Sequence, residues 1–191
     1  MTALKPAPWI VLVPLALVAG TASAHTGEHA VVGFASGFAH PFLGLDHLLA
    51  MLAVGLWAAQ QGGRALWAVP AAFVAAMGLG GLLVWVGGAL PQVETGIALS
   101  VLVLGLLIAT RRQWAAPIGM ALAAGFALFH GYAHGLEMPH AASPALYALG
   151  FVLATAVLHA AGIAGNRVGR HAVRWAGAAI AAAGLALVIG V

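Results

Sequence analysis

Residues 66–86 read LWAVPAAFVAAMGLGGLLVWV and contain no charged side chain. A helix that crosses the hydrocarbon core of a bilayer needs about 20 mostly apolar residues, so this stretch is long enough to span a membrane. The whole chain shares its character, with 63% hydrophobic and only 6% charged residues. Because a soluble domain carries roughly 25% charged residues, the composition predicts an all-α membrane protein and argues against a soluble fold.

Five further segments match this stretch in apolar content and approximate length. The six expected spans are residues 31–59, 66–86, 93–110, 116–135, 144–164 and 173–191. The loops between them are too short to form a second domain, so residues 25–191 are expected to be one six-helix transmembrane domain. Small residues spaced four apart, such as Gly131 and Gly135, are typical of closely packed membrane helices.

Residues 1–24 have the three parts of a secretory signal peptide. Lys5 gives a positive start, residues 9–18 form a short apolar stretch, and Ala22-Ser23-Ala24 is an A-x-A cleavage site. We therefore expect cleavage and a mature chain that begins at His25, outside the cytoplasm. An uncleaved segment that serves as an additional first helix is the alternative.

The arginines predict the orientation of the spans. All of them lie in or beside the loops that follow the first, third and fifth spans: Arg64, Arg111, Arg112, Arg167, Arg170 and Arg174. The intervening loops contain no Lys or Arg, and this alternation places the arginine loops in the cytoplasm. Six spans then leave both mature termini in the periplasm of a bacterial inner-membrane protein. The net charge of +3 thus reflects topology, and no basic patch indicates a nucleic-acid partner.

The first candidate site is HPFLGLDH, which begins at His40 and interrupts the first span. Pro41 cannot donate a backbone hydrogen bond and Gly44 weakens a helix, so we expect a broken helix here. If the helix continued, His40 and His47 would share a face. An aspartate at a helix centre costs about 2.5–3.5 kcal/mol on insertion, which favours a functional Asp46. Asp46 is a candidate metal ligand or, alternatively, orients a ligating histidine.

The second candidate site is FHGYAHGLE, which ends at Glu137. On a helix, His130 and His134 lie one turn apart and Glu137 follows three residues later, so the three share a stripe. The topology places both candidate sites at a similar depth, toward the outer side, where they could converge. Imidazole and carboxylate ligands suit a divalent transition-metal ion. The chain has no cysteine, which excludes a thiolate site.

The remaining candidate residues receive weaker predictions. His159 is a deep ligand, a relay or a packing residue, and Met51 is a core residue or a weak soft ligand. Glu94 is expected to be a carboxylate at a helix start, and His171 a solvated residue among the cytoplasmic arginines. His25 and His29 could bind metal weakly beside the new amino terminus, and His140 is expected in a loop.

The two motifs, together with the MLAVGLWA that starts at Met51, resemble the HupE/UreJ family. The resemblance extends along the whole chain. It implies a permease for nickel or cobalt that serves hydrogenase or urease maturation, with no enzymatic activity and no tightly bound cofactor. It also implies that the metal-handling residues are His40, Asp46, His47, His130, His134 and Glu137. Nickel is indicated by the resemblance alone, because these residue types suit zinc or cobalt equally well.

Two other functions fit the residues. A membrane-embedded zinc-dependent hydrolase with a site near the periplasmic face needs three protein ligands, which His130, His134 and one partner could supply. No serine nucleophile is evident beside them. A bis-histidine haem protein is the third possibility. The chain lacks a G-x-x-x-x-G-K loop, so direct use of ATP is not expected. The residues leave the driving force and the oligomeric state open.

Overall fold

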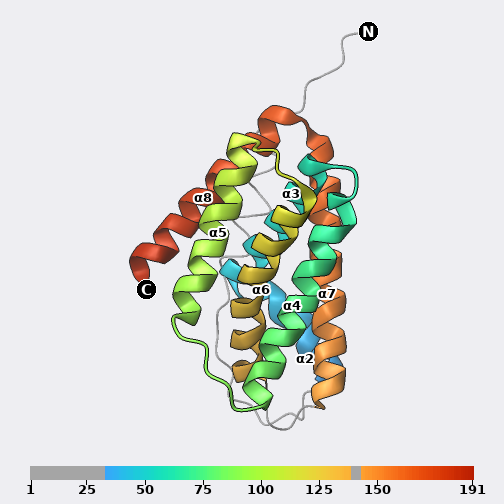
Figure 1. The fold of residues 1–191 in the computed structure, drawn as a ribbon, viewed down its shortest axis with the longest axis vertical. Coiled ribbons are helices and arrows are strands. Elements are labelled where there is room, and N and C mark those ends of the chain that lie inside the picture. Colours follow the sequence, from blue (N-terminus) through green and yellow to red (C-terminus); the bar gives the residue numbers. More distant parts are fainter. Residues whose placement is uncertain (1–32, 139–142) are drawn as a thin grey trace. The chain divides into compact units, whose positions relative to one another are not determined.

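The computed structural model describes residues 33–138 and 143–191, and within these ranges every regular element is a helix. In chain order they are α2 (Gly33–Ala39), η2 (His40–Phe42), α3 (Leu45–Gln61), α4 (Ala65–Trp85), α5 (Val93–Thr110), α6 (Ala116–Glu137), α7 (Pro144–Gly165), η3 (Asn166–Val168) and α8 (Arg170–Gly190). The long helices run alongside one another (Figure 1). The all-α prediction is confirmed. The expected signal peptide lies outside the described residues, as do His25, His29 and His140.

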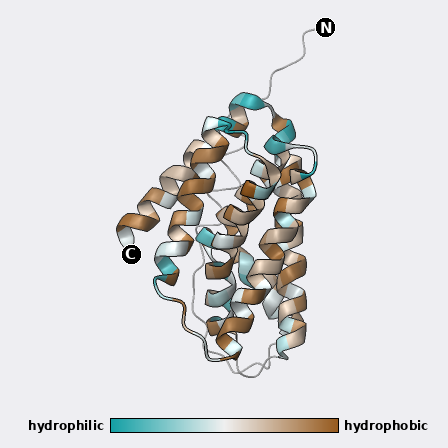
Figure 2. Cartoon of the chain, in the orientation of Figure 1, coloured by the Kyte–Doolittle hydropathy of each residue, from teal (hydrophilic) through white to brown (hydrophobic). Residues whose placement is uncertain are grey.

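Five helices, α4 to α8, are each long and apolar enough to cross a membrane. A sixth candidate span consists of α2 and η2 followed by α3, with a bend of 79° at the break. Large apolar side chains such as Leu79, Leu149 and Ile189 are exposed on the outside of the helices, where apolar residues predominate (Figure 2). Such an extensive apolar surface is suited to contact with lipid, and the chain is a multi-pass membrane protein.

Helix α3 is central to the packing, because it contacts α4, α5, α7 and α8. Ala50, Val54 and Trp57 on this helix are fully buried. Around it, α4 packs against α6 and α5 packs against α8. Gly131 permits the first of these close approaches, since a Cβ atom there would overlap the backbone carbonyl of Met77. The small-residue pattern read from the sequence therefore does mark a helix–helix contact.

The three arginine loops lie at one end of these helices. The side-chain amide of Gln61 donates to the carbonyl of Arg112 at 2.7 Å, and its oxygen accepts from the backbone N–H of Trp114 at 2.9 Å. These bonds join the loop after the first span to the loop after the third span. Arg111 and Arg170 line one hollow, so the loops after the third and fifth spans lie close together. A common end for all three loops agrees with the predicted alternation of the arginines.

The first span breaks where the sequence predicts, but more sharply than a kinked helix. Pro41 stands in the short η2 turn, and Gly44 has an extended backbone (φ −97°, ψ 122°) just before α3 begins. The shared helical face expected for His40 and His47 therefore does not exist, because the two residues belong to different elements. Asp46 is not at a helix centre either: it lies in the first turn of α3, where the positive end of the helix dipole stabilises a carboxylate.

Candidate metal-binding site

Asp46 fixes the orientation and the tautomer of His47. Its Oδ1 accepts the backbone N–H of His47 at 2.7 Å and lies 2.8 Å from the Nδ1 atom of the same residue. A carboxylate can only accept here, so Nδ1 carries the hydrogen and Nε2 keeps a free lone pair. That Nε2 is buried and has no hydrogen-bond partner among the described residues. This geometry favours the orienting role of Asp46 that the sequence left as an alternative.

Gly44 leaves room for this arrangement. A Cβ atom at this position would lie 2.8 Å from Oδ1 of Asp46 and 3.3 Å from Nδ1 of His47. The first of these distances is shorter than a carbon and an oxygen tolerate without displacement. The glycine therefore does more than weaken a helix: it lets the carboxylate fold back over the start of α3.

Ser100 of α5 performs the same task for His130. Its hydroxyl donates to the carbonyl of Ile97 at 2.6 Å and lies 2.8 Å from Nε2 of His130. Since the single hydroxyl hydrogen is used on Ile97, Ser100 accepts from His130 and the lone pair of that ring is on Nδ1. His130 is fully buried, and its Nδ1 has no partner in the part of the chain that the structure describes.

Glu137 joins the two candidate motifs at their exposed end. Its Oε2 lies 2.9 Å from Nε2 of His40 and 3.5 Å from Nδ1 of His134, the second contact without hydrogen-bond geometry. One potential ligand atom from each of these three residues lies within 4.8 Å of the others. Two imidazoles and one carboxylate at this spacing form a ligand set for a borderline divalent ion.

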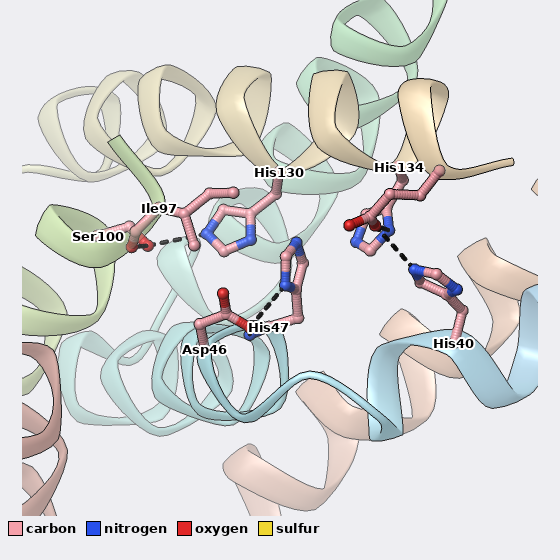
Figure 3. A network of polar contacts seen from close by, with 8 residues as sticks. His40, Asp46, His47, Ile97, Ser100, His130 and His134 are labelled. Atoms are coloured by element: carbon pink, nitrogen blue, oxygen red, sulfur yellow. Dashed lines mark hydrogen bonds and ion pairs between the residues drawn. The ribbon is translucent and has the colours of Figure 1, made fainter. Parts of the chain in front are cut away.

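The four histidine rings follow one another in a file (Figure 3). The ring centroids are 4.8 Å apart from His40 to His134, 4.2 Å from His134 to His47, and 4.7 Å from His47 to His130. The side chain of His40 is 28% exposed, those of His134 and His47 are 6% and 8% exposed, and His130 is 0% exposed. The file therefore leads from an accessible mouth into the protein interior.

Aromatic side chains surround the file. Tyr147 and Phe151 of α7 lie against the ring of His40. The ring centroid of Phe151 is also 4.0 Å from that of His134. An apolar cavity of about 360 Å³ between α4, α6 and α7 reaches His134 from the side. Its lining is poor in polar groups, so the 53% exposed side chain of Glu137 is the more suitable contact for an arriving cation.

All six residues predicted from the two motifs converge here. Sequence reasoning missed Ser100, which belongs to no motif; its one signal is a hydroxyl within the otherwise apolar stretch 96–109. The sequence indicates no serine nucleophile beside the histidines; Ser100 does lie beside His130, but its hydroxyl is fully buried and donates to a backbone carbonyl.

The residues with weaker predictions fall elsewhere. Met51 is fully buried in the core, and His159 is 3% exposed and lies apart from the file. Glu94 is exposed in the first turn of α5, as expected for a carboxylate at a helix start. His171 is exposed and lines the hollow that also contains Arg170.

Similarity to known proteins shows the family of this chain. A family model described as HupE / UreJ protein matches residues 13–187. Protein HupE of Rhizobium leguminosarum bv. viciae is 47% identical over 174 residues, which cover 88% of this chain and 91% of that protein. No solved structure matches the chain significantly. The family model spans nearly the whole sequence, including both histidine motifs, and the chain belongs to the HupE/UreJ family.

Proposed function

We propose that this protein is an inner-membrane permease that moves a divalent transition-metal ion, nickel, into the cytoplasm for hydrogenase or urease maturation. The observation that carries the proposal is the file of four histidines, which runs from an exposed carboxylate to a fully buried ring. Membership of the HupE/UreJ family supports transport rather than catalysis.

The ligand atoms suit stepwise transfer of an ion. Glu137 attracts the cation at the mouth, where His40 and His134 replace part of its water shell. The ion then exchanges these ligands for His47 and His130 and so moves inward. The nitrogens that receive it have no other partner among the described residues. Because these ligands are neutral imidazoles, each site binds the ion firmly enough to admit it and weakly enough to release it.

The two ends of the molecule support the inward direction that we propose. The mouth at Glu137 and the arginine loops lie at opposite ends of α6, since Glu137 is its last residue and Arg112 precedes its start. With the arginine loops in the cytoplasm, the mouth opens to the periplasm. A membrane potential of about 100 mV, negative inside, then favours entry of a divalent ion by roughly 4–5 kcal/mol.

A hydrolase is less well supported than a permease. The hydroxyl of Ser100 contacts His130, as a nucleophile contacts its base, but it is fully buried and its hydrogen is donated to Ile97. A catalytic zinc also needs an open coordination position for water, whereas the cavity that reaches His134 is lined almost entirely by apolar groups. We therefore assign the metal ion as the transported substrate.

Radioactive nickel uptake in cells without nickel transporters of their own tests the proposal, with cobalt and zinc as competitors. We expect His134→Ala and His47→Ala each to reduce uptake by at least about tenfold at equal amounts of membrane protein. His171→Ala is the matched control, because that histidine is exposed beside the arginines at the other end. Uptake at the unmutated level in both file variants would make the histidines packing residues and would refute the proposal.

A further inference from the structure

Beyond the histidine file, three helices bring polar and soft side chains together in the bundle interior. The hydroxyl of Thr155 on α7 lies 3.5 Å from the sulfur of Met51 on α3 and 4.0 Å from the sulfur of Met77 on α4. Thr155 and Met51 are fully buried, and Met77 is 4% exposed. One hydroxyl thus contacts two thioethers, and Met77 also lines the apolar cavity that reaches His134.

His159 adds an imidazole to this group. It follows Thr155 by one turn of α7, and side chains on a helix lean toward the N-terminus, so its ring leans toward Thr155. The residue is 3% exposed, and its Nε2 has no hydrogen-bond partner within the described ranges. Burial of an unpaired polar nitrogen is costly. An apolar residue would fill the same space without that cost, which points to a ligand for this nitrogen.

Phe73 connects this group to the file. Its ring centroid lies 5.7 Å from that of His130 and 5.3 Å from that of His159. Phe73 also precedes Met77 by one turn of α4, so the two side chains face the same interior. The backbone of His159 in turn packs against Gly55, one turn from Met51. His159 therefore occupies the next position after His130, with one aromatic ring between them.

We propose that Met51, Met77, Thr155 and His159 form a second, deeper binding station for the transported cation. This inference deepens the proposed function and rests on it. The station offers one imidazole, one hydroxyl and two thioethers, a neutral set suited to borderline and soft transition ions. It contains no carboxylate, so it holds the ion more weakly than the mouth does and lets it continue toward the arginine end. Phe73 separates the two stations.

The absence of cysteine from the chain permits a direct spectroscopic test. Thr155→Cys introduces a single thiol into the full-length purified protein, which is titrated with NiCl₂. We expect a near-ultraviolet thiolate-to-nickel charge-transfer band that weakens when His159→Phe is added. Val157→Cys is the matched control, since that side chain is 47% exposed on the same helix, and it should give no band. A folded Thr155→Cys protein without the band, or a band indifferent to His159→Phe, would overturn the proposal.

Nickel uptake gives the second measurement. We expect His159→Phe to lower uptake by about tenfold or more, and Met51→Leu combined with Met77→Leu to lower it by a smaller factor. Met→Leu changes volume little, and Met120→Leu, at a half-buried position on α6, is the control. Uptake that depends on His134 but not on His159 would refute the deeper station alone. Uptake independent of both would refute the proposed function itself.

Discussion

Asp46 and Ser100 act on the site through one atom each. Asp46 accepts from Nδ1 of His47, and Ser100 accepts from Nε2 of His130. Each contact decides which ring nitrogen keeps its lone pair, and in both rings that nitrogen is buried without a partner in the described structure. Neither residue has to touch the ion to matter, because an imidazole binds metal only through an unprotonated nitrogen.

Removal of the serine hydroxyl should weaken nickel binding. In Ser100→Ala the Nε2–H of His130 loses its acceptor, so the ring no longer has a fixed tautomer. We expect the apparent affinity in uptake assays to fall by about 10- to 100-fold, the usual cost of losing such a supporting contact. Thr110→Ala is the control, since this hydroxyl also donates to its own helix, to Leu106 at 2.7 Å, but is exposed at the arginine end. An unchanged affinity in Ser100→Ala would show that the tautomer is set by something else.

At the scale of elements, the break between α2 and α3 has a specific purpose. It buries His47 in the first turn of α3, whereas the side chain of Asp46 is 25% exposed and Leu45 is 57% exposed. The backbone N–H of His47 then donates to the carboxylate of Asp46, which satisfies one group of the helix start that would otherwise be costly to bury.

Gly44→Ala should disturb this start of α3. The added methyl group would lie 2.8 Å from Oδ1 of Asp46 and force the carboxylate away from His47. We expect reduced nickel uptake from a protein that still reaches the membrane. Gly78→Ala is the matched control, because a Cβ atom there meets nothing within 4 Å and alanine favours a helix over glycine by about 1 kcal/mol. Equal uptake by the two variants would mean that the carboxylate tolerates displacement.

The sequence predicts these elements well where the bilayer dictates their length. The span expected at residues 93–110 coincides with α5, and that expected at 66–86 differs from α4 by one residue at each end. The bend of 79° could not be predicted, because Pro41 and Gly44 indicate a break without specifying its angle. Convergence of the two motifs followed from matching depth. Ser100 escaped notice because its role depends on the packing of α5 against α6, which no local pattern encodes.

At the scale of the whole molecule, the arginine loops predict the topology. We expect a reporter fused after Arg112 to be cytoplasmic and one fused after His140 to be periplasmic, because positively charged loops stay inside. Paired alkaline phosphatase and fluorescent-protein fusions measure both positions. The opposite location at either one would contradict the six-span arrangement with both mature termini outside.

External pH should alter the apparent affinity for nickel. Metal binding requires neutral imidazoles, and an unperturbed histidine side chain has a pKa of about 6.5. Protons therefore compete with nickel at the mouth, and affinity should weaken as the external pH falls from about 7.5 to about 5.5. Uptake curves against free nickel at several pH values, with the membrane potential clamped, provide the measurement. A constant affinity across this range would shift the role of first ligand from the histidines to Glu137.

The order of the histidine rings has a mechanical consequence. Along the file, His40 and His47 come from the chain segment around the break, whereas His134 and His130 come from α6, so that consecutive rings alternate between the two sides. Every transfer of an ion between neighbouring rings thus crosses between the segment around the break and α6. A small slide of α6 relative to both η2 and α3 changes all three ring separations together. The spacing of the whole path is then governed by a single helix displacement.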